Sequence, residues 1–330
     1  MPPLSVPALL PGMRVQHELL VLDRAEKKTA AGDPFVVLTL GNATGRIDTA
    51  PVWSDKLEWA HGADPGRIVQ VIGEVSRYGR NGVEKRQLSL TAPVRALPNE
   101  QFNIEDFLPR VEEDFDILWS GLDKARGTVK AGTLRAVLDL FFADEEFRLR
   151  FERTPGSTSG HHAKVGGLLQ HTLEVARIAA AAAKTVRKAN EELVIVGALL
   201  HDVGKVEAYE VGPNGFAYTP CGLLVGHVVL GLLMLERRLA AVGKRLCTDA
   251  QLIELQHMIL SHHGKHEYGS PVEPMTVEAE IVHRADEASA KATDFLDAFD
   301  DAELWAEGGE MSKRSWKLSR RLWRRPYDWE

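Results

Sequence analysis

Cysteine is nearly absent from this chain of 330 residues, which contains only Cys221 and Cys247. The two cysteines lie far apart and form no CxxC pair, which argues against a disulfide framework or a thiolate metal site. Long apolar runs are also missing, since no stretch approaches the roughly 18 residues of a membrane-spanning helix. The first residues, MPPLSVPALLPGM, contain four prolines and no basic region, so they are a poor signal peptide. Together these absences predict a soluble cytoplasmic protein with no membrane partner.

An excess of positive charge is missing too. The formal net charge is −7 at pH 7, so the molecule as a whole does not attract nucleic acid, and any such binding needs a local basic surface. Hydrophobic residues make up 44% of the chain. In a chain of this length they suffice for two domains with separate cores.

The sequence changes character near residue 95. Residues 1–95 contain about five short runs rich in β-forming residues, separated by the turn signals AAGDP, NATG and GRNG. Short strands in this number and length predict a small barrel such as an OB-fold. The alternation of side chains places Phe35 and Trp53 in the core of that barrel.

The rest of the chain is predicted to be mainly helical because its apolar residues recur at 3.6-residue spacing. We expect a connector with a helix over residues 96–125, an all-α bundle over residues 126–300, and a basic, tryptophan-rich tail over residues 301–330. Asn190 and Thr248 are expected helix N-caps. The predicted fold is therefore multidomain α+β, with an N-terminal OB-like β-barrel followed by an all-α helical bundle.

Two local basic surfaces could bind nucleic acid. In the barrel, Arg77, Tyr78 and Arg80 lie at the predicted GRNG hairpin, and aromatic and basic side chains together suit single strands. In the tail, which carries seven basic residues, Trp316 and Trp323 are seven positions apart and would share one helix face. An equally good interpretation is a terminal helix that packs its tryptophans onto the body or onto another subunit.

The histidines are concentrated in the helical part. Ten of the twelve lie between residues 161 and 283, and several of them sit among apolar residues at helical spacing. One such histidine usually has a structural role, but several in successive helices, accompanied by carboxylates, are costly to bury without partners. Metal ions would satisfy them, because they bind neutral imidazole and carboxylate oxygen. The candidate residues are His171, His201, Asp202, His227, His262, His263 and Asp286.

The order of these residues resembles the HD superfamily of metal-dependent phosphohydrolases. The stretch HDVGK, from His201 to Lys205, matches its central motif. The motifs HHAKVGGLLQHT, LLVGHVVLG and LSHHGKHEYGSPVEP, together with a preceding barrel, are similar to the YhaM-type 3′→5′ exoribonucleases, in which an OB domain precedes an HD domain. The resemblance implies that residues 126–300 form an HD domain. It also implies a manganese-activated 3′→5′ exonuclease that acts on single-stranded RNA or DNA through a metal-activated water.

The resemblance further implies two metal ions. His171, His201, Asp202 and Asp286 would hold the first, and Asp202 could bridge to the second. His227 and His262 would complete the second site, with His263 as an alternative or additional ligand. Manganese is favoured, although iron, cobalt or magnesium would also suit such donors.

Lys205 and Asp202 are the expected catalytic residues. Lys205 would stabilise the anionic transition state, or, in a structural role, would offset the helix dipole. Gly204 is expected to let the backbone turn sharply after the helix that His201 ends. His283 lies three residues before Asp286 and is expected to orient a metal ligand rather than to bind metal itself.

Three further histidines are candidate substrate contacts. His161 and His162 precede the helix of His171 and could reach a substrate phosphate or the metal, with loop packing as the alternative. Gly166 and Gly167 would permit close backbone approach there. His266 follows His262 and His263 and could line the entrance to the site.

Two alternatives to the exonuclease remain open. An HD phosphodiesterase or nucleotidase would act on a small nucleotide or a cyclic dinucleotide, but it has no obvious need for a barrel. A nucleic-acid-binding protein with a degenerate HD domain would lack ligands, whereas the set here is complete. A homo-oligomer with subunits around a channel would suit a processive nuclease.

Overall fold

The computed structural model describes residues 4–329 except residues 81–82, 159, 213–214, 302–303 and 307, and it leaves the side chains of Arg80, Val83 and Glu84 undescribed. The chain forms two compact units. The first contains residues 1–110 and 211–217, and the second contains residues 111–210 and 218–330. Each unit is described by itself.

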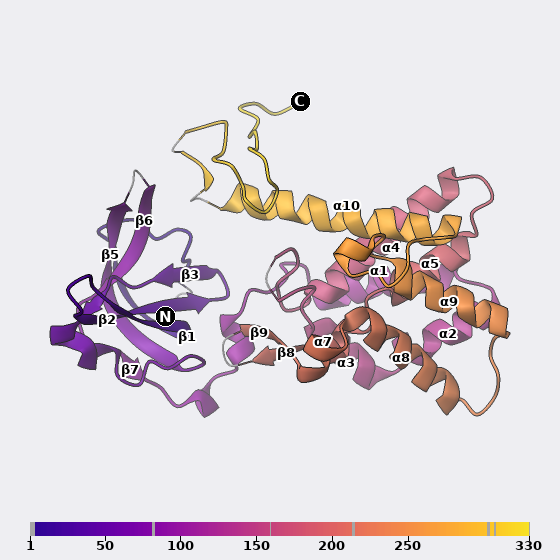
Figure 1. The fold of residues 1–330 in the computed structure, drawn as a ribbon, viewed down its shortest axis with the longest axis horizontal. Helices are drawn as coiled ribbons and strands as arrows, with labels where there is room; N and C mark the ends of the chain where they lie inside the picture. The colour runs from indigo at the N-terminus through magenta and orange to yellow at the C-terminus, as the bar shows by residue number, and fades with distance from the viewer. Residues whose placement is uncertain are drawn as a thin grey trace. The chain divides into compact units, whose positions relative to one another are not determined.

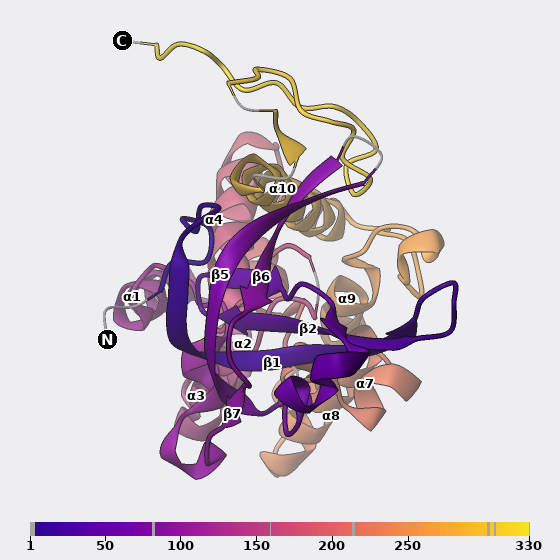
Figure 2. The same cartoon turned by 90° about the vertical axis from the view of Figure 1, so that its left-hand side faces the viewer.

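The first unit is a nearly closed antiparallel barrel (Figure 1). Its strands lie in the spatial order β3-β2-β1-β5-β6, while β4 pairs with β2 and β7 pairs with β5. A parallel bridge between Thr49 and Leu88 joins the two ends of this order, and the Ala50 amide donates to the Leu88 carbonyl at 2.9 Å. Figure 2 looks onto this unit and shows β1 and β2 running across the direction of β5 and β6. The strands are β1 (Arg14–Lys28), β2 (Pro34–Asn42), β3 (Gly45–Asp48), β4 (Val52–Trp53), β5 (Ile68–Arg80), β6 (Val83–Leu90) and β7 (Arg95–Ala96).

Alternation of side chains explains the barrel core. In β2 the side chains of Val36, Leu38 and Leu40 are buried, and the residues between them are partly exposed. Asn81 and Gly82 of the predicted GRNG turn lie outside the described residues, but β5 and β6 on either side pair from Gly73–Leu90 to Arg80–Val83. The predicted barrel is confirmed.

The prediction that Phe35 and Trp53 lie in the barrel core is wrong. Trp53 is 48% exposed and Phe35 is half-buried, and their rings lie 5.1 Å apart between centroids. Phe35 in β2 and Trp53 in β4 are directly opposite each other, so their rings form a cross-strand contact on the outer face of the barrel.

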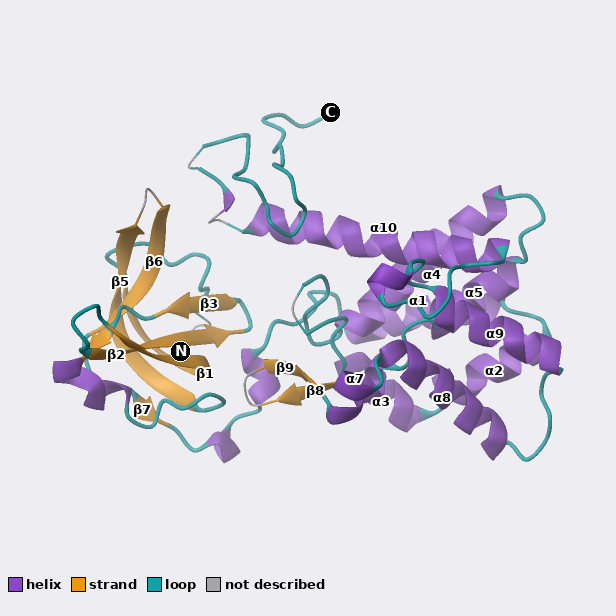
Figure 3. Ribbon diagram, in the orientation of Figure 1, coloured by secondary structure: helices purple, strands orange, loops and turns teal. Residues whose placement is uncertain are grey.

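The second unit consists mainly of helices (Figure 3). Asn190 and Thr248 are N-caps as predicted, and Thr248 forms a capping box with Gln251. The first helix begins at Phe115, within the segment expected to connect the domains. The helices are α1 (Phe115–Thr128), α2 (Gly132–Phe142), α3 (Glu145–Arg153), α4 (Gly167–Thr185), α5 (Glu191–Leu200), α6 (Lys205–Ala208), α7 (Pro220–Leu224), α8 (His227–Ala241), α9 (Asp249–Ser261) and α10 (Val277–Asp300).

Helix α5 forms the centre of this unit. Every residue from Leu193 to Leu200 is buried, and α4 and α10 pack against it. No helix in the described part of the chain is long and apolar enough to cross a membrane.

Short elements complete the chain. Strands β8 (Tyr209–Gly212) and β9 (Gly215–Tyr218) form a hairpin that the helical periodicity did not predict. Short 3-10 turns are η1 (Ser54–Ala60), η2 (Asn99–Gln101), η3 (Ile104–Phe107) and η4 (His266–Tyr268).

The predicted terminal helix does not form. The described residues after Asp300 lie in turns and isolated bridges, including Met311–Trp323 and Ser315–Arg320. Trp305, Leu318 and Leu322 are buried against α10. Leu318 and Leu322 are four positions apart, which fits one helical turn, but the hydrogen bonds between Ser312 and Leu322 fold the segment back on itself instead.

Candidate metal centre

Five helical segments bring the predicted ligands to one place. His171 lies in the second turn of α4, and His201 and Asp202 follow the last residue of α5. His227 begins α8, His262 and His263 follow the end of α9, and Asp286 lies in α10. Most of these side chains are at helix ends, and the ends of the helices meet at the common centre.

The first ligand group surrounds His171. Its Nε2 atom lies 3.0 Å from Oδ1 of Asp286, 3.3 Å from Nε2 of His201 and 3.5 Å from Oδ2 of Asp202. The distance from His201 Nε2 to Asp202 Oδ2 is 3.1 Å. Two imidazoles and two carboxylates thus direct their metal-binding atoms at one point.

The second ligand group lies on the other side of Asp202. The Oδ1 atom of Asp202 is 3.4 Å from Nε2 of His227 and 3.6 Å from Nε2 of His262. His227 and His263 bring their Nε2 atoms within 3.3 Å of each other. Asp202 therefore presents one carboxylate oxygen to each ligand group.

Backbone contacts set the tautomers of three of these histidines. The Nδ1 atoms of His201, His262 and His263 lie 2.7, 2.6 and 2.8 Å from the carbonyl oxygens of Ala198, Ile259 and Tyr268. A carbonyl only accepts, so each Nδ1 carries the proton and donates it. The Nε2 lone pairs are thereby directed into the centre, as a metal ligand requires.

His171 is oriented by side chains instead. Its Nδ1 lies 3.0 Å from the hydroxyl of Ser289, which donates to Oε2 of Glu174 at 2.7 Å. The same Glu174 oxygen lies 3.1 Å from Nε2 of His162. Sequence reasoning missed Glu174 and Ser289, although each lies three residues after a predicted ligand on the same helix face.

The unsatisfied atoms of this centre fit metal ions. Asp202 is 2% exposed, and its Oδ1 has no hydrogen-bond partner among the described residues, nor does Nε2 of the fully buried His262. Such buried atoms are costly unless something outside the protein pairs with them. Mixed imidazole and carboxylate donors suit divalent transition metals. The donors of both groups could therefore hold divalent ions.

The pKa values differ between the two groups. Burial lowers the pKa of His171, but hydrogen bonds to Asp202 and Asp286 outweigh burial and raise it to about 9. Burial lowers the pKa of His227 to about 3, against the opposing effect of Asp202, and it also lowers those of His262 and His263. Because a metal needs neutral imidazole, the second group is already in its binding form, whereas His171 must release a proton.

Lys205 is buried beside the central carboxylate. Its Nζ lies 2.6 Å from Oδ2 of Asp202, and the lysine residue is 7% exposed. Burial would raise the pKa of Asp202, but the charge of Lys205 and the neighbouring histidines hold it well below its usual value. The ionised form of Asp202 is therefore favoured.

Gly204 does not make the sharp turn that was predicted. Its φ of −67° and ψ of −17° are right-handed helical values that any residue adopts. A Cβ at this position would instead lie 2.0 Å from the His227 carbonyl and 2.3 Å from the Gly231 amide. The glycine is needed because α8 packs directly on the backbone here, which places His227 near Asp202.

The other predicted histidines surround the centre at different depths. His162 is buried against Glu174, and its φ of 56° is in the left-handed region. His161 is partly exposed, and its Nδ1 lies 3.5 Å from Asp294. His283 is buried, and its Nδ1 donates to the backbone carbonyl of His262 at 2.8 Å. His266 is exposed, with its Nδ1 3.0 Å from the Ser270 carbonyl.

The glycines before α4 do permit a close approach. Gly166 has a φ of 86°, and a Cβ on Gly167 would lie 2.0 Å from the His162 carbonyl. The loop that carries His161 and His162 therefore packs directly on the start of the helix that carries His171.

The predicted nucleic-acid contacts of the barrel belong to the first unit. Tyr78 is 49% exposed on β5, next to Arg77, whereas the side chain of Arg80 lies outside the described residues. Tyr78 and Arg77 are consecutive residues of this strand, so their side chains point to opposite faces of it.

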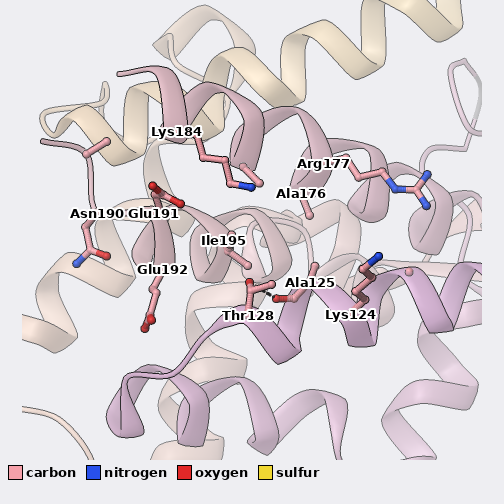
Figure 4. Close-up of a pocket in the computed structure, with 13 residues that line it drawn as sticks. Lys124, Ala125, Thr128, Ala176, Arg177, Lys184, Asn190, Glu191, Glu192 and Ile195 are labelled. Atoms are coloured by element: carbon pink, nitrogen blue, oxygen red, sulfur yellow. Dashed lines mark hydrogen bonds between the residues drawn. The ribbon is translucent and has the colours of Figure 1, made fainter. Parts of the chain in front are cut away.

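A separate pocket of about 830 Å³ lies between α1, α4 and the start of α5 (Figure 4). Lys124, Arg177 and Lys184 line it together with Glu191 and Glu192, and Figure 4 shows Lys124 and Arg177 on the side away from the two glutamates. None of the predicted metal ligands is among its lining residues. The pocket is therefore distinct from the metal centre.

Comparison with known proteins agrees with this geometry. The HD domain family matches residues 168–291, which include every predicted metal ligand. The chain is 32% identical over 320 residues to the 3′-5′ exoribonuclease YhaM of Bacillus subtilis, with 96% of each chain covered. The chain belongs to the YhaM family. Family relatives in Bacillus pumilus and Listeria innocua are 30% and 28% identical, again with 96% of each chain covered. No solved structure matches the chain.

Membership of this family confirms the resemblance that the ordered histidine and aspartate motifs indicated. The chain is an HD-domain hydrolase related to the YhaM exoribonucleases.

Proposed function

We propose that this protein is a 3′→5′ exonuclease that hydrolyses the phosphodiester bonds of single-stranded RNA, and by the same chemistry those of single-stranded DNA. One observation carries the proposal: Asp202 presents its two buried oxygens to two separate groups of histidine Nε2 atoms. Two divalent ions held in this way suit phosphoryl displacement. The names of the relatives supply the substrate class and the direction.

His171, His201, Asp202 and Asp286 hold the first ion in this proposal. His227 and His262 hold the second together with Asp202, and His263 lies within reach as a further ligand. Manganese is the favoured metal because the family resemblance implies it, and donors of nitrogen and oxygen without thiolate are compatible with it, as they are with iron or cobalt. Bound divalent ions would polarise the phosphoryl group and lower the pKa of the attacking water from about 15.7 toward neutrality.

Lys205 acts on the substrate anion. In the structure its ammonium group neutralises the charge of Asp202. Bound cations would neutralise that carboxylate instead, which would leave the ammonium group for the substrate. A lysine is a compact point charge that suits phosphate oxygen. We assign it to the charge that develops on the phosphoryl group. His161 and His266, which are the more exposed of the predicted histidines near the centre, are assigned to the incoming strand.

The barrel is assigned to binding of the longer strand. Exposed Trp53 and Tyr78, with Arg77, offer aromatic and basic contacts that tolerate any sequence. Small nucleotides do not need such a surface, which favours the exonuclease over a nucleotidase or a cyclic-dinucleotide phosphodiesterase.

A time course on a short RNA labelled at its 5′ end tests the proposal. With Mn²⁺ we expect a ladder that shortens from the 3′ end, and with EDTA intact RNA. Asp202→Asn should abolish the ladder, whereas Asp116→Asn, an exposed carboxylate in the first turn of α1, should not. Intact RNA with every metal, together with turnover of a mononucleotide or cyclic dinucleotide, would overturn it.

A further inference from the structure

The C-terminal segment from Glu310 to Arg325 is a folded lobe with a strongly basic surface. It contains seven basic residues and, after Glu310, no acidic one, in a chain of net charge −7. All seven basic residues are exposed. A local basic surface on an acidic protein is what electrostatic attraction of nucleic acid requires.

Hydrogen bonds hold the lobe together, and apolar contacts hold it against the end of α10. The Ser312 amide donates to the Leu322 carbonyl at 2.9 Å, and the Ser315 amide donates to the Arg320 carbonyl at 2.9 Å. The apolar contacts come from Leu318 and Leu322, with Trp305 stacked on Phe299. In Figure 1 the segment folds back near the C-terminal end of α10.

Trp316 and Trp323 lie outside the buried apolar cluster of the lobe, and the Trp323 indole donates to Oε2 of Glu310 at 3.5 Å. Trp316 is 87% exposed and Trp323 is 47% exposed, while Leu318 and Leu322 are buried. An indole that the fold leaves in water is available to stack on a base, and stacking needs no particular base.

Several of the arginines donate hydrogen bonds to neutral backbone carbonyls, so their charge can still attract a bound anion. Arg320, Arg321 and Arg324 donate to the backbone carbonyls of Leu318, Ser312 and Phe299. These hydrogen bonds fix the directions of the side chains without cancelling their charge, because a carbonyl is neutral. Arg314 and Arg325 are exposed and have no such backbone anchor in the described structure.

One ion pair joins the lobe to α10, at a residue that also lies beside the loop of His161. Lys317 Nζ lies 2.6 Å from Oδ1 of Asp294, and the same oxygen lies 3.5 Å from Nδ1 of His161. The ring of His161 is 6.4 Å from that of the metal ligand His171 between centroids. Trp316 precedes Lys317 in the chain, so this ion pair holds the backbone next to the exposed indole.

We propose that residues 310–325 are a second binding surface for single-stranded RNA, in which Trp316 stacks on a base and the arginines contact backbone phosphates of the strand that enters the metal centre. This assignment deepens the proposed exonuclease function and rests on it for the identity of the strand.

Equilibrium binding of a fluorescent single-stranded RNA to the full-length protein in EDTA tests the surface without cleavage. We expect Trp316→Ala to weaken binding about 5- to 100-fold, and Trp316→Phe to retain most of it. The pair Arg314→Gln and Arg325→Gln should make the plot of log Kd against log salt less steep by about 0.7 for each phosphate that the protein no longer neutralises. Arg245→Gln, an exposed arginine in the loop between α8 and α9, is the matched control and should change neither.

Hydrolysis with Mn²⁺ separates this surface from the catalytic centre. Trp316→Ala should raise KM for a long RNA while hydrolysis of bis(p-nitrophenyl) phosphate stays within about twofold, since the metal ligands are untouched. Equal RNA binding by wild type and Trp316→Ala would overturn the inference. So would loss of a dimer by Trp316→Ala in size-exclusion chromatography without loss of RNA affinity, since Trp316 would then face a second copy. If wild type binds RNA through Trp316 but no metal supports its degradation, the exonuclease proposal fails and the binding surface stands.

Discussion

The ammonium group of Lys205 lies 2.6 Å from Oδ2 of Asp202, and both residues are buried. This pair places a positive charge where the two ligand groups meet. Burial of an ionised carboxylate without such a partner costs several kcal/mol. The lysine therefore stabilises the metal-free centre in addition to its assigned part in the reaction.

Lys205→Met should lower kcat with little change in bound metal. Removal of one charged group that stabilises the transition state typically costs about 10²–10³-fold. We would measure single-turnover rates on RNA and metal content by atomic absorption. Lys184→Met, an exposed lysine near the end of α4, should leave both unchanged. A normal kcat in Lys205→Met would assign the lysine to stability alone.

Asp202→Asn should remove metal and activity together. The carboxylate serves both ligand groups, and metal assistance is worth several kcal/mol, so we expect kcat/KM to fall by about 10³-fold or more. Isothermal titration with Mn²⁺ should show loss of binding in parallel. Full turnover by this variant would refute a metal mechanism centred on Asp202.

Glu174→Gln and Ser289→Ala test the hydrogen bonds that orient His171. Ser289 and Glu174 lie on the Nδ1 side of His171, away from the Nε2 atom that faces Asp286, so the substitutions should weaken Mn²⁺ binding by about 10–100-fold. At saturating Mn²⁺ most of the activity should return, which a directly catalytic residue would not allow. Glu145→Gln, exposed in the first turn of α3, should leave the Mn²⁺ titration unchanged.

Gly204→Ala should destabilise the protein by about 1–3 kcal/mol or more, because the added methyl group would collide with the backbone at the start of α8. Urea unfolding gives the free energy directly. Gly127→Ala in α1 is the matched control: its Cβ would meet nothing within 4 Å, and we expect it to stabilise by about 0.5–1 kcal/mol. Equal effects of the two substitutions would contradict the close-packing argument.

The metal-free protein should lose stability in acid. The pKa of His227 is held at about 3 by burial, below the ordinary value near 6.5. As the pH falls below about 6.5, this histidine binds a proton in the unfolded state but not in the folded state. The free energy of unfolding therefore falls by about 1.4 kcal/mol per pH unit. His171 acts in the opposite direction, because its pKa is raised to about 9. The stability that its protonation contributes is fully present below about pH 6.5 and is lost as the pH rises toward 9.

Urea unfolding in EDTA between pH 6.5 and 4 measures the acid effect. His227→Asn should reduce the slope of unfolding free energy against pH by close to one proton. An unchanged slope would show that His227 is protonated, and thus not buried as a neutral ligand, in the folded protein.

The sequence by itself determined most of the barrel strands and several helix starts. Alternation predicts the strands, and Asn190 and Thr248 predict helix N-termini, because periodicity and capping act between side chains close in sequence. The candidate ligands from His171 to Asp286 were predicted from the order of their motifs, which resembles the HD superfamily.

Only the tertiary structure decided which distant side chains meet. Ser289 and Glu174 are 115 residues apart. Gly204 is required because the backbone at the start of α8, more than twenty residues later in the chain, packs against it. Trp53 lies outside the barrel core, and the terminal helix is replaced by a folded lobe in which Leu322 bonds Ser312. Packing of whole elements sets such contacts, and the free energy of that packing outweighs the weak local preference that periodicity records.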